Sequence, residues 1–122
     1  MLKKILVVDD EPVVVTLLKS PIESRGFKVE IATEGASAIE KAKEWRPDLI
    51  LLDIVMPGMD GFEICRRLKA TKELAAIPVV LFTASQETQL EELAREVGAV
   101  TVIKKPFVEQ VFRAISEILN SK

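Results

Sequence analysis

The sequence DLILLDIVMPG, residues 48–58, decides the fold of this 122-residue chain. Leu49 to Leu52 form a short, continuous apolar run without helical spacing, which is typical of a strand buried on both faces. The run ends in Asp53, and Pro57 with Gly58 then predicts a loop. A carboxylate at the end of a buried strand is either a cap for the following loop or a reactive group. The rest of the sequence has to decide between these two interpretations.

Five segments of this kind alternate with helical patterns along the chain. The segments with the length and apolar content of strands are residues 5–8, 28–32, 49–52, 77–82 and 100–103. Apolar residues at helical spacing follow each of them, beginning near Pro12, Ala36, Phe62, Leu90 and Val108. Strict alternation predicts an α/β fold, a single three-layer domain in which a five-stranded parallel sheet has helices on both faces. Pro21 interrupts the first helical pattern and predicts either a kink or a restart there.

Composition is that of a globular domain and excludes several functions. Apolar residues make up 48% and charged residues 30% of the chain. The net charge of −2 gives no basic excess for nucleic acid or an anionic membrane, and no apolar run is long enough to cross a bilayer. A single cysteine, Cys65, excludes an internal disulfide and fits the cytoplasm. The chain has no histidine, which excludes histidine-based catalysis within it.

Four of the predicted strands end in polar side chains, and parallel pairing would bring these ends to one edge of the sheet. The residues concerned are Asp9 and Asp10, then Asp53, Thr83 and Lys105. Each one alone has an ordinary interpretation as a helix cap or as a solvated surface charge. Their convergence is harder to explain in that way, because ligands of open α/β sheets bind at this edge.

Carboxylates gathered in this way need a cation. Two of them about 4 Å apart repel by roughly 4 kcal/mol at an effective dielectric constant of 20. Ligation by carboxylate oxygens suits Mg²⁺, and Mg²⁺ with a lysine would stabilise charge on a phosphoryl group attached nearby. Asp53 would then be a nucleophile that forms an acyl phosphate, and the Thr83 hydroxyl could donate to a phosphoryl oxygen.

Five short motifs carry a resemblance to a known family. They are DDEP at 9–12, PDLILLD at 47–53, MPGMDG at 56–61, TA at 83–84 and KPF at 105–107. In this order and spacing they resemble the receiver domain of bacterial two-component response regulators, over essentially the whole chain from about Lys3 to the last helix. The resemblance implies the flavodoxin-like strand order 2-1-3-4-5 and a cis peptide bond between Lys105 and Pro106.

The resemblance also implies a role for each acidic residue of the site. Asp53 accepts a phosphoryl group from the phosphohistidine of a sensor histidine kinase or a phosphotransfer protein. Asp10 and Asp53 ligate Mg²⁺ together with the backbone carbonyl of Val55, and Asp9 assists through water. Such a protein is a phosphoacceptor that assists its own phosphorylation and dephosphorylation, and is not an enzyme in the ordinary sense.

Thr83 and Lys105 are expected to contact the phosphoryl oxygens. Phosphorylation would switch a surface that binds a downstream protein target or output domain, without direct contact with nucleic acid or membrane. We expect a monomer, with dimerisation on phosphorylation left open. Residues 1–122 are expected to form one receiver domain without an output domain, either as a stand-alone protein or as part of a larger regulator.

The sequence departs from the family pattern at several positions. The usual aromatic residue three positions before the motif lysine is replaced by Val102, and Pro21 is unusual in the first helix. Val102 has too little volume for a large side-chain swing, so we expect output to depend on residues 84–88 and the fourth helix. Val55 and Ser85 stand at the positions that flank the attacking water in this family, and neither is an acid or amide suited to orienting it. We therefore expect slow self-dephosphorylation.

Three other functions would fit parts of this sequence. A haloacid-dehalogenase-like phosphatase needs a second acid two residues after its nucleophile, where this chain has Val55. A flavodoxin-like cofactor protein needs a loop rich in hydroxyl groups and glycine after the first strand, where this chain has the acidic residues 9–11. A degenerate receiver that acts only as a docking module is disfavoured, because all five site residues are present.

Overall fold

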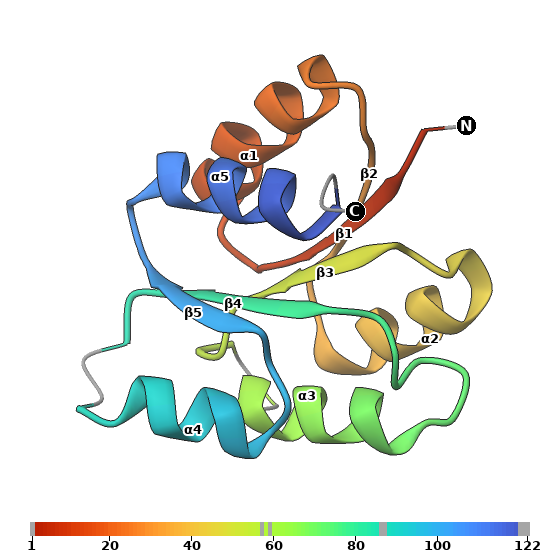
Figure 1. Ribbon diagram of the computed structural model, residues 1–122, viewed down its shortest axis with the longest axis vertical. Helices are drawn as coiled ribbons and strands as arrows, with labels where there is room; N and C mark the ends of the chain where they lie inside the picture. Colours follow the sequence, from red (N-terminus) through yellow and green to blue (C-terminus); the bar gives the residue numbers. More distant parts are fainter. Residues whose placement is uncertain (1, 57, 59, 86–87, 120–122) are drawn as a thin grey trace.

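The computed structural model describes residues 2–56, 58, 60–85 and 88–119, and this part of the chain folds into three layers (Figure 1). The elements in chain order are β1 (Lys4–Val8), α1 (Pro12–Ser24), β2 (Lys28–Ala32), α2 (Gly35–Trp45), β3 (Leu49–Leu52), α3 (Gly61–Ala70), β4 (Val79–Thr83), α4 (Leu90–Glu96), β5 (Thr101–Lys104) and α5 (Val108–Leu119). The five strands are parallel and lie in the order β2-β1-β3-β4-β5, which confirms the predicted fold and strand order.

The central strands are buried because both faces of the sheet are covered. Helices α1 and α5 pack on one face, and α2, α3 and α4 pack on the other (Figure 1). Along β3, Leu49 and Leu51 belong to the core under α1 and α5, while Ile50 and Leu52 belong to the core under α2, α3 and α4. All four side chains are at most 1% exposed, and each such burial is worth about 1.5–3 kcal/mol. This explains why the strand reads as a continuous apolar run instead of an alternating one.

Helix α1 continues through Pro21, so the restart that the sequence left open is wrong. Leu18 and Ile22, on either side of the proline, are fully buried in the same core and hold the two halves of the helix on the sheet. Pro21 has no N–H to donate to the Leu17 carbonyl. Leu17 is 51% exposed, which allows water to supply that hydrogen bond. A bend at Pro21 stays a prediction.

Three strands begin or end slightly differently from the apolar runs in the sequence. β1 starts one residue earlier, at Lys4, and β4 covers Val79–Thr83 instead of residues 77–82. β5 starts at Thr101, one residue later than expected, because its register with β4 pairs Thr101 with Val80 and Lys104 with Thr83. β2 has the predicted bounds and lies at the opposite edge of the sheet. Of the loop predicted after Asp53, Gly58 has a φ of +83°, and Pro57 lies outside the described residues.

Candidate functional site

Three aspartates meet at the carboxyl edge of the sheet. Backbone hydrogen bonds extend the strand pairing by one residue at two of them: Asp9 N–H donates to the Ala32 carbonyl at 3.0 Å, and Asp53 N–H donates to the Val8 carbonyl at 2.9 Å. Asp9 and Asp53 are 2% and 3% exposed, and Asp10 is partly exposed. One carboxylate oxygen from each of Asp9, Asp10 and Asp53 lies within 4.8 Å of the others. These three residues could together hold a metal ion.

Lys105, directly after β5, brings a positive charge to the same place. Its backbone N–H donates to the Thr83 carbonyl at 2.8 Å, and the Lys105–Pro106 bond is cis, as the resemblance predicted. The Lys105 ammonium lies 2.9 Å from Asp9 Oδ2 and 3.3 Å from Asp53 Oδ2. One lysine therefore partly neutralises two buried carboxylates that belong to different strands.

Lys105 and Asp9 respond to burial in opposite ways. Burial lowers the pKa of Lys105, but hydrogen bonds to Glu11 and Asp9 and the charge of Asp53 outweigh it and hold the pKa above the ordinary value. Burial raises the pKa of the Asp9 carboxyl and outweighs the hydrogen bonds from the Glu11 backbone and Lys105. Lys105 thus stays charged at neutral pH. Burial disfavours the charged form of Asp9, and a divalent cation would stabilise that form.

Asp53 fits both interpretations that the sequence left open, a cap for the following loop and a reactive group. Its Oδ1 accepts a hydrogen bond from Val55 N–H at 3.1 Å, so the carboxylate does cap the loop that follows β3. Its Oδ2 faces Lys105, and Asp53 is one of the residues around an open pocket. The described residues that line this acidic pocket are Asp10, Glu11, Asp53, Val55, Met56, Ala84, Ser85 and Lys105.

Thr83 is the last residue of β4 and directly precedes Ala84 and Ser85 of this pocket. Its side chain is fully buried, and its hydroxyl oxygen accepts a hydrogen bond from Ser85 N–H at 3.1 Å. Thr83 is not among the described residues that line the acidic pocket. The expected contact between its hydroxyl and a phosphoryl group therefore stays a prediction.

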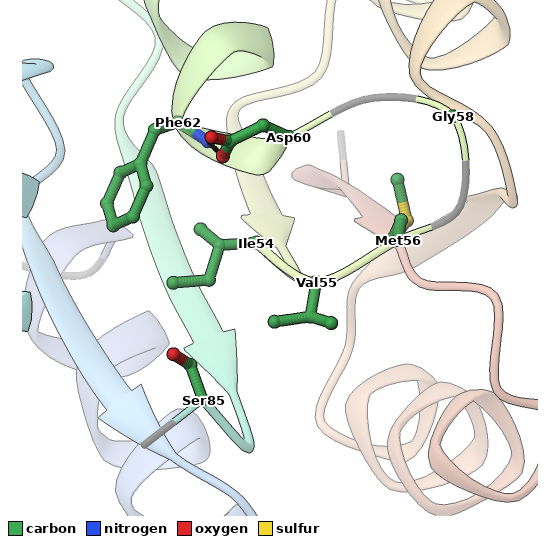
Figure 2. Close-up of a pocket in the computed structure, with 7 residues that line it drawn as sticks. All are labelled: Ile54, Val55, Met56, Gly58, Asp60, Phe62 and Ser85. Atoms are coloured by element: carbon green, nitrogen blue, oxygen red, sulfur yellow. Dashed lines mark hydrogen bonds between the residues drawn. The ribbon is translucent and has the colours of Figure 1, made fainter. Parts of the chain in front are cut away.

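A second pocket lies beside the first and shares Val55, Met56 and Ser85 with it (Figure 2). The remaining residues around it are Ile54, Gly58, Asp60 and Phe62. Figure 2 shows Asp60 accepting the hydrogen bond from Phe62 N–H, 2.8 Å long, that caps helix α3. Gly61 permits the close approach of α3 to the end of β3, because a Cβ atom there would lie 2.2 Å from Ile54 Cα.

The structure adds one residue to the site that the sequence did not single out. Glu11 Oε1 lies 2.6 Å from Lys105 Nζ, a shorter contact than either aspartate makes with this lysine. The signal in the sequence was limited to the position of Glu11 directly after the acidic pair.

The fifth strand carries Val102 where the family usually has an aromatic residue. Val102 pairs with Leu81 of β4 and packs, partly buried, against the core under α4. In the segment 84–88, which the sequence predicts to carry the output signal, residues 86 and 87 lie outside the described part of the chain.

The fold and the site define a class of protein: a doubly wound α/β domain with three aspartates and a lysine at the carboxyl edge of its sheet. Comparisons with known proteins agree with this class. The sequence profile of the response regulator receiver domain matches residues 5–117. The chain belongs to the response regulator receiver domain family, whose members act in two-component phosphorelay signalling.

Similar proteins agree with this assignment. The alkaline phosphatase synthesis transcriptional regulatory protein PhoP of Bacillus subtilis is 43% identical over 107 residues, which are 88% of this chain and 44% of that protein. The chain thus spans less than half the length of this relative. Among solved structures, chemotaxis protein CheY4 of Vibrio cholerae superposes with a TM-score of 0.89 at 27% identity, covering 97% of this chain and 99% of that one. The BeF₃-activated receiver domain of Klebsiella pneumoniae RstA gives a TM-score of 0.86 at 32% identity, covering 98% and 100%.

Among the residues that the structure describes, no helix is long and apolar enough to cross a bilayer.

Proposed function

We propose that Asp53 is the phosphoacceptor of this receiver domain and that Mg²⁺ is its metal cofactor. The observation that supports this most directly is the meeting of three carboxylates and the Lys105 ammonium at one edge of the sheet, where Asp10, Asp53 and Lys105 also line the acidic pocket. Asp10 and Asp53 would ligate Mg²⁺ together with the Val55 carbonyl, and Asp9 would assist through water, because Mg²⁺ prefers oxygen ligands and keeps several positions for water and phosphate. When bound, Mg²⁺ offsets the negative charge of the transferred group.

The transfer needs one bond to form and one to break. A carboxylate oxygen of Asp53 bonds to the phosphorus, the P–N bond of the donor phosphohistidine breaks, and its electron pair stays on the imidazole nitrogen. Lys105 lies 3.3 Å from Asp53 Oδ2 and supplies positive charge beside the new aspartyl phosphate. The Thr83 hydroxyl oxygen accepts a hydrogen bond from Ser85 N–H, which leaves its own O–H free to donate to a phosphoryl oxygen. The domain thereby assists its own phosphorylation and dephosphorylation.

The partners follow from this chemistry. The donor is a sensor histidine kinase or a phosphotransfer protein, in the cytoplasm, and the response is read by a protein target or an output domain. PhoP is named a transcriptional regulatory protein and this chain matches 44% of it, so we propose that residues 1–122 work as the receiver unit of such a regulator or as a stand-alone receiver. The net charge of −2 gives this unit no basic surface excess for nucleic acid or membranes. We propose that it is monomeric until phosphorylation changes its partner surface.

The test is incubation with acetyl phosphate and Mg²⁺ followed by intact-mass spectrometry. The protein should gain one phosphoryl group that is stable in acid and lost in base, and chelation of Mg²⁺ should prevent the gain. Asp53→Ala should not be labelled. Asp60→Asn is the matched control, because it changes a nearby carboxylate of the neighbouring pocket and keeps an oxygen for the helix cap. Undiminished labelling of Asp53→Ala would refute the assignment.

A further inference from the structure

Glu11 uses its side chain in an unusual way for its position. It is the N-cap residue of α1, a position that favours Ser, Thr, Asp or Asn. Its side chain makes no capping hydrogen bond to that helix. It reaches across the sheet edge to Lys105, which is 94 residues away in the sequence, and contacts the ammonium at 2.6 Å. Helix capping therefore does not account for the direction of the Glu11 side chain.

The contact has one buried and one exposed partner. The Lys105 side chain is 9% exposed, whereas the Glu11 side chain is 56% exposed. The two residues line the acidic pocket together with Asp53. Lys105 Nζ lies 2.6 Å from Glu11 and 3.3 Å from Asp53, so the ammonium contacts the exposed carboxylate more closely than the acceptor.

We propose that Glu11 is a positioning residue that holds Lys105 in the unphosphorylated state and competes with the incoming phosphoryl group for its charge. This inference rests on the proposed role of Asp53. Phosphoryl transfer to Asp53 requires Lys105 to face the phosphoryl oxygens, so its contact with Glu11 has to loosen first. An interaction that is stronger in the ground state than in the transition state slows the reaction. Glu11 thus limits the rate at which the domain gains a phosphoryl group.

A simpler effect has to be separated from this one. Glu11 also adds negative charge beside a pocket that receives an anionic donor, and that charge alone would slow the donor's approach. Capture of Lys105 depends on the reach of the carboxylate, whereas repulsion depends only on its charge. Glu11→Asp keeps the charge and withdraws the carboxylate by one methylene, so it distinguishes the two effects.

The experiment measures the rate of labelling by acetyl phosphate at saturating Mg²⁺. Glu11→Gln should be labelled about two- to fivefold faster than the wild type, the range for removing one partly exposed ion pair. Glu11→Asp should also be faster than the wild type. Glu23→Gln is the matched control, because Glu23 is an exposed glutamate of the same helix that pairs with Lys19 at 3.3 Å and lies outside the site. Its labelling rate should equal that of the wild type.

A binding measurement supplies a readout that does not depend on turnover. Beryllium trifluoride, a mimic of the phosphoryl group, should bind Glu11→Gln more tightly by a similar factor. In a double-mutant cycle with Lys105→Met, the effect of Glu11→Gln should disappear, because no ammonium is left to capture.

The possible results separate the inference from the proposed function. Faster labelling of both Glu11 variants supports capture of Lys105. A Glu11→Asp rate equal to the wild type, or an unchanged Glu11→Gln effect in the Lys105→Met background, overturns it in favour of repulsion. Slower labelling of Glu11→Gln also overturns it, because Glu11 would then assist the transfer. A wild type that takes up no label contradicts the role of Asp53, and the inference fails with it.

Discussion

Asp10→Asn should stabilise the metal-free domain, although it removes a residue of the site. The oxygens of Asp9, Asp10 and Asp53 lie within 4.8 Å of one another, and at that limit each pair of charges repels by about 3.5 kcal/mol at an effective dielectric constant of 20. Lys105 is paired with Asp9 and Asp53, so the substitution removes repulsion from Asp10 without breaking either of these ion pairs.

The size of the gain is reduced by solvent. Asp10 is partly exposed, and screening lowers the net effect to about 1 kcal/mol. A gain of that size raises the melting temperature by roughly 3–6 °C in a domain of this length. Mg²⁺ should favour the wild type over the variant. At a Mg²⁺ concentration one hundred times the dissociation constant, the wild type gains about 2.7 kcal/mol of unfolding free energy, and the variant gains less.

Thermal unfolding followed by circular dichroism, with and without Mg²⁺, measures both effects. Asp60→Ala is the contrasting variant, because Asp60 caps α3 through Phe62 N–H at 2.8 Å and its loss should cost about 1 kcal/mol. If Asp10→Asn is less stable than the wild type in the absence of metal, Asp10 is a structural cap as Asp60 is, and the reasoning from charge repulsion fails.

Three further predictions concern the residues around the site and the core. Cys65 is buried and its thiol pKa is raised by burial, so a thiol reagent should modify the native protein far more slowly than the unfolded one; equal rates would contradict the burial. Gly61→Ala should cost about 1–3 kcal/mol in denaturant unfolding, because the new Cβ would lie 2.2 Å from Ile54 Cα; an unchanged midpoint would show that α3 can shift freely. The phosphorylated domain should lose its phosphoryl group more slowly than a Val55→Asn, Ser85→Glu double variant, measured as loss of label after donor removal; equal decay would remove the argument from these two positions.

The parallel sheet and the meeting of the site residues followed from local patterns, whereas the strand order was implied by the resemblance to receiver domains. Leu49 to Leu52 must be a buried strand because four consecutive apolar side chains need cover on both faces of a sheet, and the structure provides it. Parallel pairing then brings the residues after β1, β3, β4 and β5 to one edge, whatever the details of the helices. The sequence therefore predicts which residues the backbone brings to the site.

Side-chain geometry was not predictable in the same way. Glu11 reads as a solvated charge until the fold places Lys105 within 2.6 Å of it, because their contact spans 94 residues of sequence. Thr83 reads as a group that faces the pocket, yet its side chain is fully buried and it is not among the described residues that line the pocket. Pro21 reads as a helix breaker, but the burial of Leu18 and Ile22 beside it outweighs the loss of one hydrogen bond.

The central claim is that Asp53 carries the phosphoryl group, and residue-level mapping tests it most directly. Borohydride reduces an aspartyl phosphate to homoserine, which peptide mass spectrometry locates in the sequence. After incubation with acetyl phosphate and Mg²⁺, the account predicts homoserine at position 53 alone. Homoserine at position 9 or 10, or a phosphoryl group on the Ser85 hydroxyl, would contradict it.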